Sequence, residues 1–326
     1  MKPVLLCLAL LLSAFIPQSP EESPELKEAT ALTESVVKLS REGKLDEALP
    51  LAKRALEIRE RLLPRTDPRV ALSLSYLADL YRAKRDYGAA KNLLQRLLQI
   101  QEEQSGPTDA GLARTLERLA WINLSDGDVG KAEERYKRAL ELKEKALGPD
   151  NVQVADTLVG LATVYRVRRD FKSGAPLFKR ALTIYAQLSG VNAPVFHETA
   201  ENFTCLAHET LNRDAEKDLD EIWKRFAPPG SPAESPYITQ NGKALSLPKP
   251  SYAEEARLRR LSGFVVVKVT VDENGRVISA RDMCQGSPLL SPGALESARN
   301  AKFAPRMVNN QAVKFDGVIT YRFAFQ

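Results

Sequence analysis

A 42-residue repeat between about residue 28 and residue 226 restricts the possible folds of this chain more than any other feature. Val70, Leu112 and Val154 begin three successive copies that align without a gap. An earlier copy begins near Glu28, and a decayed copy follows from Phe196. A repeat of this length predicts one small structural unit per copy, stacked in a linear array.

Each copy contains two apolar stripes at helical spacing, separated by a short turn such as Asp126-Gly127-Asp128. Ala90, Ala132 and Gly174 occupy equivalent positions, where a small residue lets paired helices approach closely. The pattern resembles the tetratricopeptide repeat, whose usual period is about 34 residues. The longer period resembles the kinesin light chain form. We therefore expect an all-α solenoid at residues 25–226 with about five helix pairs.

Residues 249–326 alternate between apolar and polar side chains with a period of two, which predicts strands. Val265, Val267, Val269 and Val271 share one face of the first long strand, and Asn274-Gly275 then provides a strong hairpin signal. Phe315 to Phe325 alternates in the same way. A short helix beginning at Pro292 lies between these strands. These elements predict a small α+β domain with helices on one sheet face.

This order, with the stretches GFVVVKVTVDENGRVISA and VKFDGVITYRFAFQ, resembles the TonB C-terminal domain family. The resemblance implies the envelope of a Gram-negative bacterium and an extended peptide of an outer-membrane receptor as partner. The peptide would pair with the edge of the last long strand. That edge is formed by Val318, Ile319, Thr320, Tyr321, Arg322 and Phe323. Alternatively, a neighbouring domain or a second copy covers the edge.

The usual Tyr-Pro opening of that family is Tyr252-Ala253 here, a change that the fold should tolerate. Two other departures argue against energy transduction: the N-terminal segment has no His, which members driven by the proton-motive complex use, and a solenoid replaces their long Pro/Lys-Glu spacer. The apolar run at 4–16 is shorter than the roughly 20 residues of a spanning helix. We expect a signal peptide at 1–19, or a short membrane anchor if it is not cleaved. Residues 227–248 read as a Pro-rich spacer.

The positive charge of the chain is concentrated in its last domain. Residues 249–326 contain twelve Lys and Arg against seven Asp and Glu, a difference of +5, whereas residues 21–226 have 33 against 34. Such an asymmetry favours an anionic partner. No nucleic-acid recognition motif accompanies the charge, so nucleic acid is not an expected partner.

A second candidate site is the concave face of the solenoid. The repeat positions direct six side chains toward it: Tyr76, Arg82, Arg114, Arg118, Trp121 and Arg166. An exposed Trp among arginines would suit a peptide with an aromatic or acidic end. In the alternative interpretation, Trp121 packs between repeats and the arginines form a solvated face.

Cys205 and Cys284 fall in different predicted domains, and we expect two buried thiols rather than a disulfide. Glu201, Cys205 and His208 follow i, i+4, i+7 spacing and share a helix face, where they form either a zinc site or a half-buried cap. We favour the cap and expect no metal or cofactor. No catalytic motif occurs, so we do not expect an enzyme.

The sequence therefore predicts an exported protein-binding protein of the cell envelope. Its solenoid would hold one partner while its last domain binds an extended peptide, and this could transmit energy to outer-membrane transport. Proline at Ile319 or Tyr321 would then abolish peptide binding. The competing hypothesis is a periplasmic structural adaptor that binds peptidoglycan or assembles envelope complexes without any role in transport.

Overall fold

The computed structural model describes seven stretches of the chain in two compact units, 1–104 and 105–326, which we treat separately. The predicted signal peptide and most of the predicted spacer lie outside the described stretches. Within them, no helix is both long and apolar enough to cross a membrane. The described residues are 23–104, 110–191, 193–210, 214–229, 244–284, 286–308 and 310–324.

The described part of the first unit, residues 23–104, contains four helices: α1 (Pro24–Arg41), α2 (Leu45–Leu62), α3 (Pro68–Ala83) and α4 (Tyr87–Gln104). Helix α1 begins where Ser23 Oγ accepts a hydrogen bond from the Leu26 N–H, and α3 begins in the same way at Asp67. Ala48 and Ala90 are fully buried at equivalent repeat positions, which lets helices of successive pairs pack closely.

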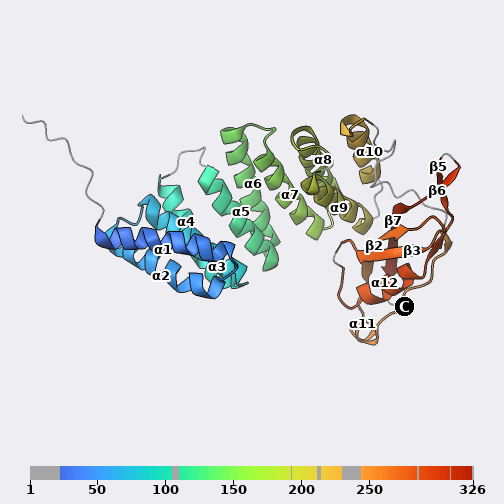
Figure 1. Ribbon diagram of the computed structural model, residues 1–326, viewed down its shortest axis with the longest axis horizontal. Coiled ribbons are helices and arrows are strands. Elements are labelled where there is room, and N and C mark those ends of the chain that lie inside the picture. The colour runs from blue at the N-terminus through green and yellow to red at the C-terminus, as the bar shows by residue number, and fades with distance from the viewer. Residues whose placement is uncertain are drawn as a thin grey trace, which may run out of the picture. The chain divides into compact units, whose positions relative to one another are not determined.

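Six further helices open the second unit (green to olive in Figure 1). They are α5 (Ala110–Ser125), α6 (Val129–Leu147), α7 (Val152–Val167), α8 (Phe171–Leu188), α9 (Pro194–Glu209) and α10 (Asp214–Phe226). The decayed last repeat still packs into the hydrophobic core. Phe203 is fully buried, and its ring lies 5.7 Å from that of Phe178. The α-solenoid prediction is confirmed.

The second unit ends in a small domain built on the antiparallel sheet β3-β2-β7. Helix α12 covers one face of this sheet, and strand β1 pairs with β4 although it falls within the stretch predicted as spacer. The elements are β1 (Ala244–Ser246), α11 (Glu254–Leu258), β2 (Gly263–Val271), β3 (Val277–Asp282), α12 (Ser291–Arg299), β4 (Lys302–Phe303), β5 (Arg306–Val308), β6 (Gln311–Val313) and β7 (Phe315–Phe323).

The predicted alternation determines which face of the sheet is buried. Val265, Val267 and Val269 pack with Ile319 and Tyr321 of β7 into one core with α12. The side chains between them, among them that of Lys268, lie on the opposite face. The predicted α+β fold of this domain is confirmed.

The turn between β2 and β3 depends on Gly275. Its φ is +79°, and a Cβ at this position would lie 1.9 Å from the carbonyl oxygen of Phe303. We expect Gly275→Ala to lower the free energy of unfolding by about 2–4 kcal/mol, from backbone strain and overpacking together. Chemical denaturation measures this loss.

Gly127 provides the matched control. It has a φ of +80° in the turn between α5 and α6, and no atom lies within 4 Å of the added Cβ. Gly127→Ala should therefore cost only the backbone strain, about 1 kcal/mol. If both variants lost the same free energy of unfolding, the contact with the Phe303 carbonyl would not explain the cost at Gly275.

Candidate functional site

Strand β7 lies at one edge of the sheet, and within the described stretches no other strand pairs with its outer side. The Val266 carbonyl accepts a hydrogen bond from the Met283 N–H (2.8 Å) on the β3 side of β2. In an antiparallel ladder, a residue that bonds to one neighbouring strand does not bond to the other. Thr320, opposite Val266, therefore directs its N–H and C=O outward.

The predicted edge strand thus contains two kinds of residue. By the same alternation, Val318 and Arg322 also direct their backbone groups outward. Ile319, Tyr321 and Phe323 instead bond to β2, and their side chains are buried in the core. Burial raises the pKa of Tyr321 to about 12. The free edge therefore offers backbone groups at Val318, Thr320 and Arg322.

The predicted groove residues come from three helices. Tyr76 and Arg82 lie on α3 in the first unit, where Arg82 Nε is 3.7 Å from the Asp79 carboxylate. Arg114, Arg118 and Trp121 share one face of α5, and 40% of the Trp121 surface is exposed. Arg166 lies on α7 and forms an ion pair with Glu209 of α9.

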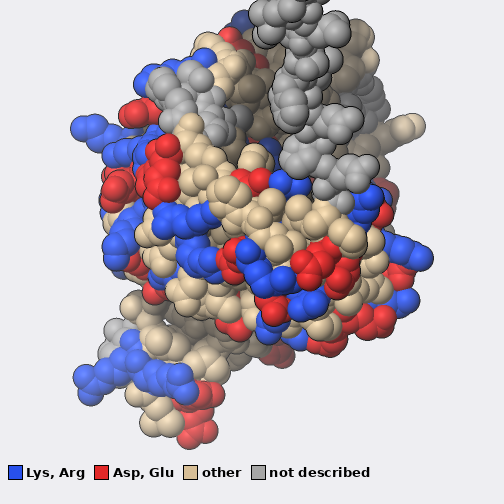
Figure 2. All heavy atoms as spheres, turned by 90° about the vertical axis from the view of Figure 1, so that its left-hand side faces the viewer, with Lys and Arg blue, Asp and Glu red and all other residues tan. Residues whose placement is uncertain are grey.

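Charges elsewhere on the solenoid are mixed. Figure 2 shows one face of the molecule on which Lys and Arg side chains alternate with Asp and Glu side chains. In the first unit, for example, Arg61 Nη2 lies 2.9 Å from Glu25 Oε1 at an exposed position. These pairs are typical of a solvated surface and point to no ligand.

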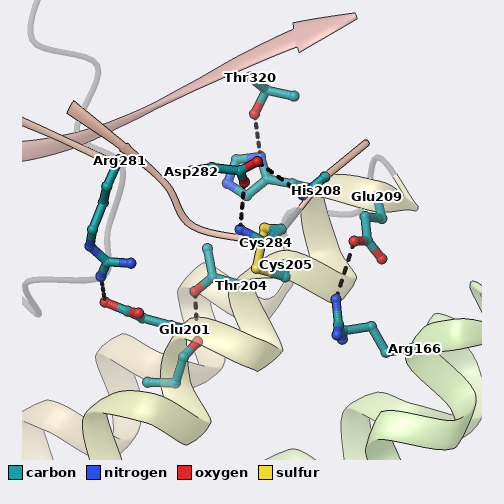
Figure 3. Close-up of a disulfide and its surroundings, with 12 residues drawn as sticks. Arg166, Glu201, Thr204, Cys205, His208, Glu209, Arg281, Asp282, Cys284 and Thr320 are labelled. Carbon is teal, nitrogen blue, oxygen red and sulfur yellow. Dashed lines mark hydrogen bonds and ion pairs between the residues drawn. A yellow bond between two sulfur atoms is a disulfide. The ribbon is translucent and has the colours of Figure 1, made fainter. Parts of the chain in front are cut away.

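Helix α9 contacts the sheet face opposite α12, through polar residues of both elements (Figure 3). Glu201 forms ion pairs with Lys268 of β2, at 3.2 Å, and with Arg281 of β3. His208 Nδ1 lies 2.8 Å from Thr320 Oγ1 of β7. The sheet is therefore held between α12 and α9. In this interface, burial lowers the pKa of His197, and the positive charge of Lys268 adds to this effect.

A disulfide between Cys205 and Cys284 fastens this contact, with the two Cα atoms 5.5 Å apart. The prediction of two buried thiols is wrong. Cys205 is buried on α9, and Cys284 follows β3 in a loop shaped by Asp282. The Asp282 carboxylate accepts hydrogen bonds from the Cys284 and Gly286 N–H groups, at 3.1 Å and 3.0 Å.

The three residues that the sequence offered as a possible zinc site all contact the last domain instead. Glu201, Cys205 and His208 bond to Arg281, Cys284 and Thr320 respectively. Among the described residues, no cluster of His, Cys, Asp and Glu could hold a metal ion. The sequence held two signals of this interface: the helix face shared by these residues, and the pair of cysteines in a chain predicted to be exported. The shared face did not reveal which surface it would meet.

Comparisons with known proteins agree with the two-part organisation. Residues 29–103, 69–145 and 111–187 match the tetratricopeptide repeat family. Residues 248–325 match the family described as Gram-negative bacterial TonB protein C-terminal. No curated protein matches the chain.

Two solved structures share the fold of the helical region. One is a putative kinesin light chain of Podosopora anserina with TPR-like repeats, with 17% sequence identity and a TM-score of 0.54. The match covers 62% of the present chain and 98% of the kinesin light chain structure. The other is BtubC (BKLC) from P. vanneervenii, with 20% sequence identity and a TM-score of 0.51. This match covers 63% of the present chain and 91% of the BtubC chain. The chain therefore combines tetratricopeptide repeats, whose fold is shared with kinesin light chain structures, with a C-terminal domain that matches the TonB C-terminal family, and this combination supports a protein-binding role in association with the cell envelope.

Proposed function

We propose that the last domain binds an extended peptide by strand addition to β7 while the solenoid holds a second protein. The observation that carries this proposal is the outward direction of the backbone groups of Val318, Thr320 and Arg322. An unpaired row of N–H and C=O groups attracts another strand. The positive charge of the domain favours an acidic peptide. An exposed segment of an outer-membrane receptor is the partner we propose.

For the solenoid partner, we propose the α5 face with Arg114, Arg118 and Trp121 as the contact surface. The exposed indole of Trp121 next to guanidinium groups suits an aromatic or acidic peptide end. Tyr76, Arg82 and Arg166 belong to the same predicted groove. Of these, Arg166 is already paired with Glu209.

The Cys205–Cys284 bond supports export, because disulfides persist mainly in oxidising compartments. The same bond favours the competing function, a periplasmic adaptor for envelope complexes or peptidoglycan. A domain fastened to α9 cannot move away on its spacer, as force transmission across the periplasm would require. An uncleaved N-terminus that co-purifies with inner-membrane motor proteins would instead support energy transduction. Mass spectrometry of the mature N-terminus distinguishes the two.

Strand addition is tested by backbone amide NMR on the oxidised protein. The probe is a short peptide of alternating valine and glutamate. The control is a peptide of the same residues interrupted by prolines, which cannot pair as a strand. We expect the largest shifts at Val318, Thr320 and Arg322 with the first peptide only. Shifts confined to other surfaces, or equal shifts with both peptides, would refute strand addition at β7.

A further inference from the structure

A pocket of about 460 Å³ lies where the ends of α7 and α9 meet the last domain. The helices contribute Arg166, Arg169 and Glu209 to its lining, and the domain contributes Phe264 and Leu290. Its volume falls within the range of roughly 300–1,000 Å³ that is typical of small-molecule sites. No described residue of β7 lines this pocket, so its lining is distinct from the strand-addition site.

The charged groups of this pocket leave one positive charge uncompensated. Among the described residues that line it, Arg166 and Arg169 accompany one carboxylate, that of Glu209. Arg166 uses Nη1 to contact Glu209 Oε1 at 3.3 Å, while its buried Nε has no hydrogen-bond partner. The structure gives the exposed side chain of Arg169 no hydrogen bond or ion pair with any described residue. Because Arg166 Nε is buried, the donors that a ligand in this pocket can reach include those of the exposed Arg169 guanidinium.

The domain side of the pocket combines the polar Ser262 and Ser287 with apolar side chains, which the neighbouring α7 extends. Leu290 is 2% exposed, Phe264 is half-buried at the start of β2, and Val167 contributes an exposed side chain at the end of α7. An acceptor that fits both walls therefore has an anionic head and an apolar body. Carboxylates suit the head, because arginine can donate two parallel hydrogen bonds to one carboxylate.

We propose that this pocket binds a carboxylate attached to an apolar group, either a free small acid or the C-terminal residue of a peptide. The carboxylate accepts hydrogen bonds from the exposed Arg169 guanidinium, and the positive charge of Arg166 lies in the same pocket lining. The apolar group packs against Phe264 and Leu290. Because Cys284 also lines the pocket, the disulfide keeps the two walls together.

Isothermal titration calorimetry on the oxidised full chain tests the site with three probes: 3-phenylpropanoate, N-acetyl-alanyl-phenylalanine and the C-terminal amide of that dipeptide. We expect at least one carboxylate to bind, and the amide to bind about tenfold or more weakly than its parent acid. The stronger of the two acids identifies the source of the ligand. Absence of binding by both acids at millimolar concentration, or equal binding of acid and amide, overturns the proposal.

Arg169→Gln is the principal variant, because the exposed side chain of Arg169 contributes little to folding. We expect it to weaken carboxylate binding about tenfold to a hundredfold, as loss of a charge-assisted hydrogen bond does. Arg166→Gln should also weaken binding, through loss of its positive charge, with a melting curve to verify its fold. Arg168→Gln is the matched control, because Arg168 pairs with Glu133 instead of lining the pocket. Equal affinity in the Arg169 and Arg168 variants also overturns the proposal.

Discussion

Cys284→Ala is expected to lower the free energy of unfolding of the second unit by on the order of 4 kcal/mol. The bond it removes joins residues 79 positions apart, and the chain-entropy model gives that magnitude, roughly, for a loop of this length. Cys205 remains in its buried position in this variant, so no cavity forms on α9. Chemical denaturation of the oxidised protein and of the variant measures the difference.

Loss of the bond should also loosen the docking of the last domain. The ion pairs of Glu201 and the contact between His208 and Thr320 then remain, and partly exposed contacts of this kind contribute about 1 kcal/mol or less each. Hydrogen exchange at α9 and β2 should therefore increase. The reduced wild-type protein is the control and should behave like Cys284→Ala. Unchanged denaturation midpoints after reduction would contradict this account.

Local patterns predicted the elements of this chain well. The 42-residue repeat reflects packing within and between helix pairs, so the sequence alone shows that Ala48 is equivalent to Ala90 and that Phe203 is equivalent to Leu77. All four side chains are buried. The alternation around Val267 and the turn at Asn274-Gly275 likewise predict β2 and β3, because side-chain direction and turn geometry are properties of neighbouring residues.

Such local patterns did not predict the interface between α9 and the sheet. The spacing of Glu201, Cys205 and His208 shows that they share a helix face, but not what that face contacts. Their partners Arg281, Cys284 and Thr320 lie on separate elements far along the chain. Only the assembled sheet brings those partners together, so the sequence suggested a metal site or a cap where the structure has a docking surface.

Val318→Pro is expected to weaken peptide binding at β7 about tenfold or more, since it removes an outward N–H and blocks the pairing of a new strand. The ladder between β7 and β2 should survive, because the Val318 N–H does not bond to β2. Proline at Ile319 or Tyr321, the substitutions that the sequence suggests, would instead break that ladder. Their effect on binding could not be separated from unfolding of the domain.

Ala280→Pro is the matched control on the opposite edge of the sheet. Ala280 lies opposite Val269, whose backbone groups bond to β7, so the Ala280 N–H also points away from β2. Both proline variants therefore lose one outward donor, and only one of them alters the proposed site. Fluorescence anisotropy with the labelled valine–glutamate peptide should show weak binding for Val318→Pro and wild-type binding for Ala280→Pro. Equal affinities in the two variants would exclude strand addition at β7, because the peptide would then bind without using the outward backbone groups of that strand.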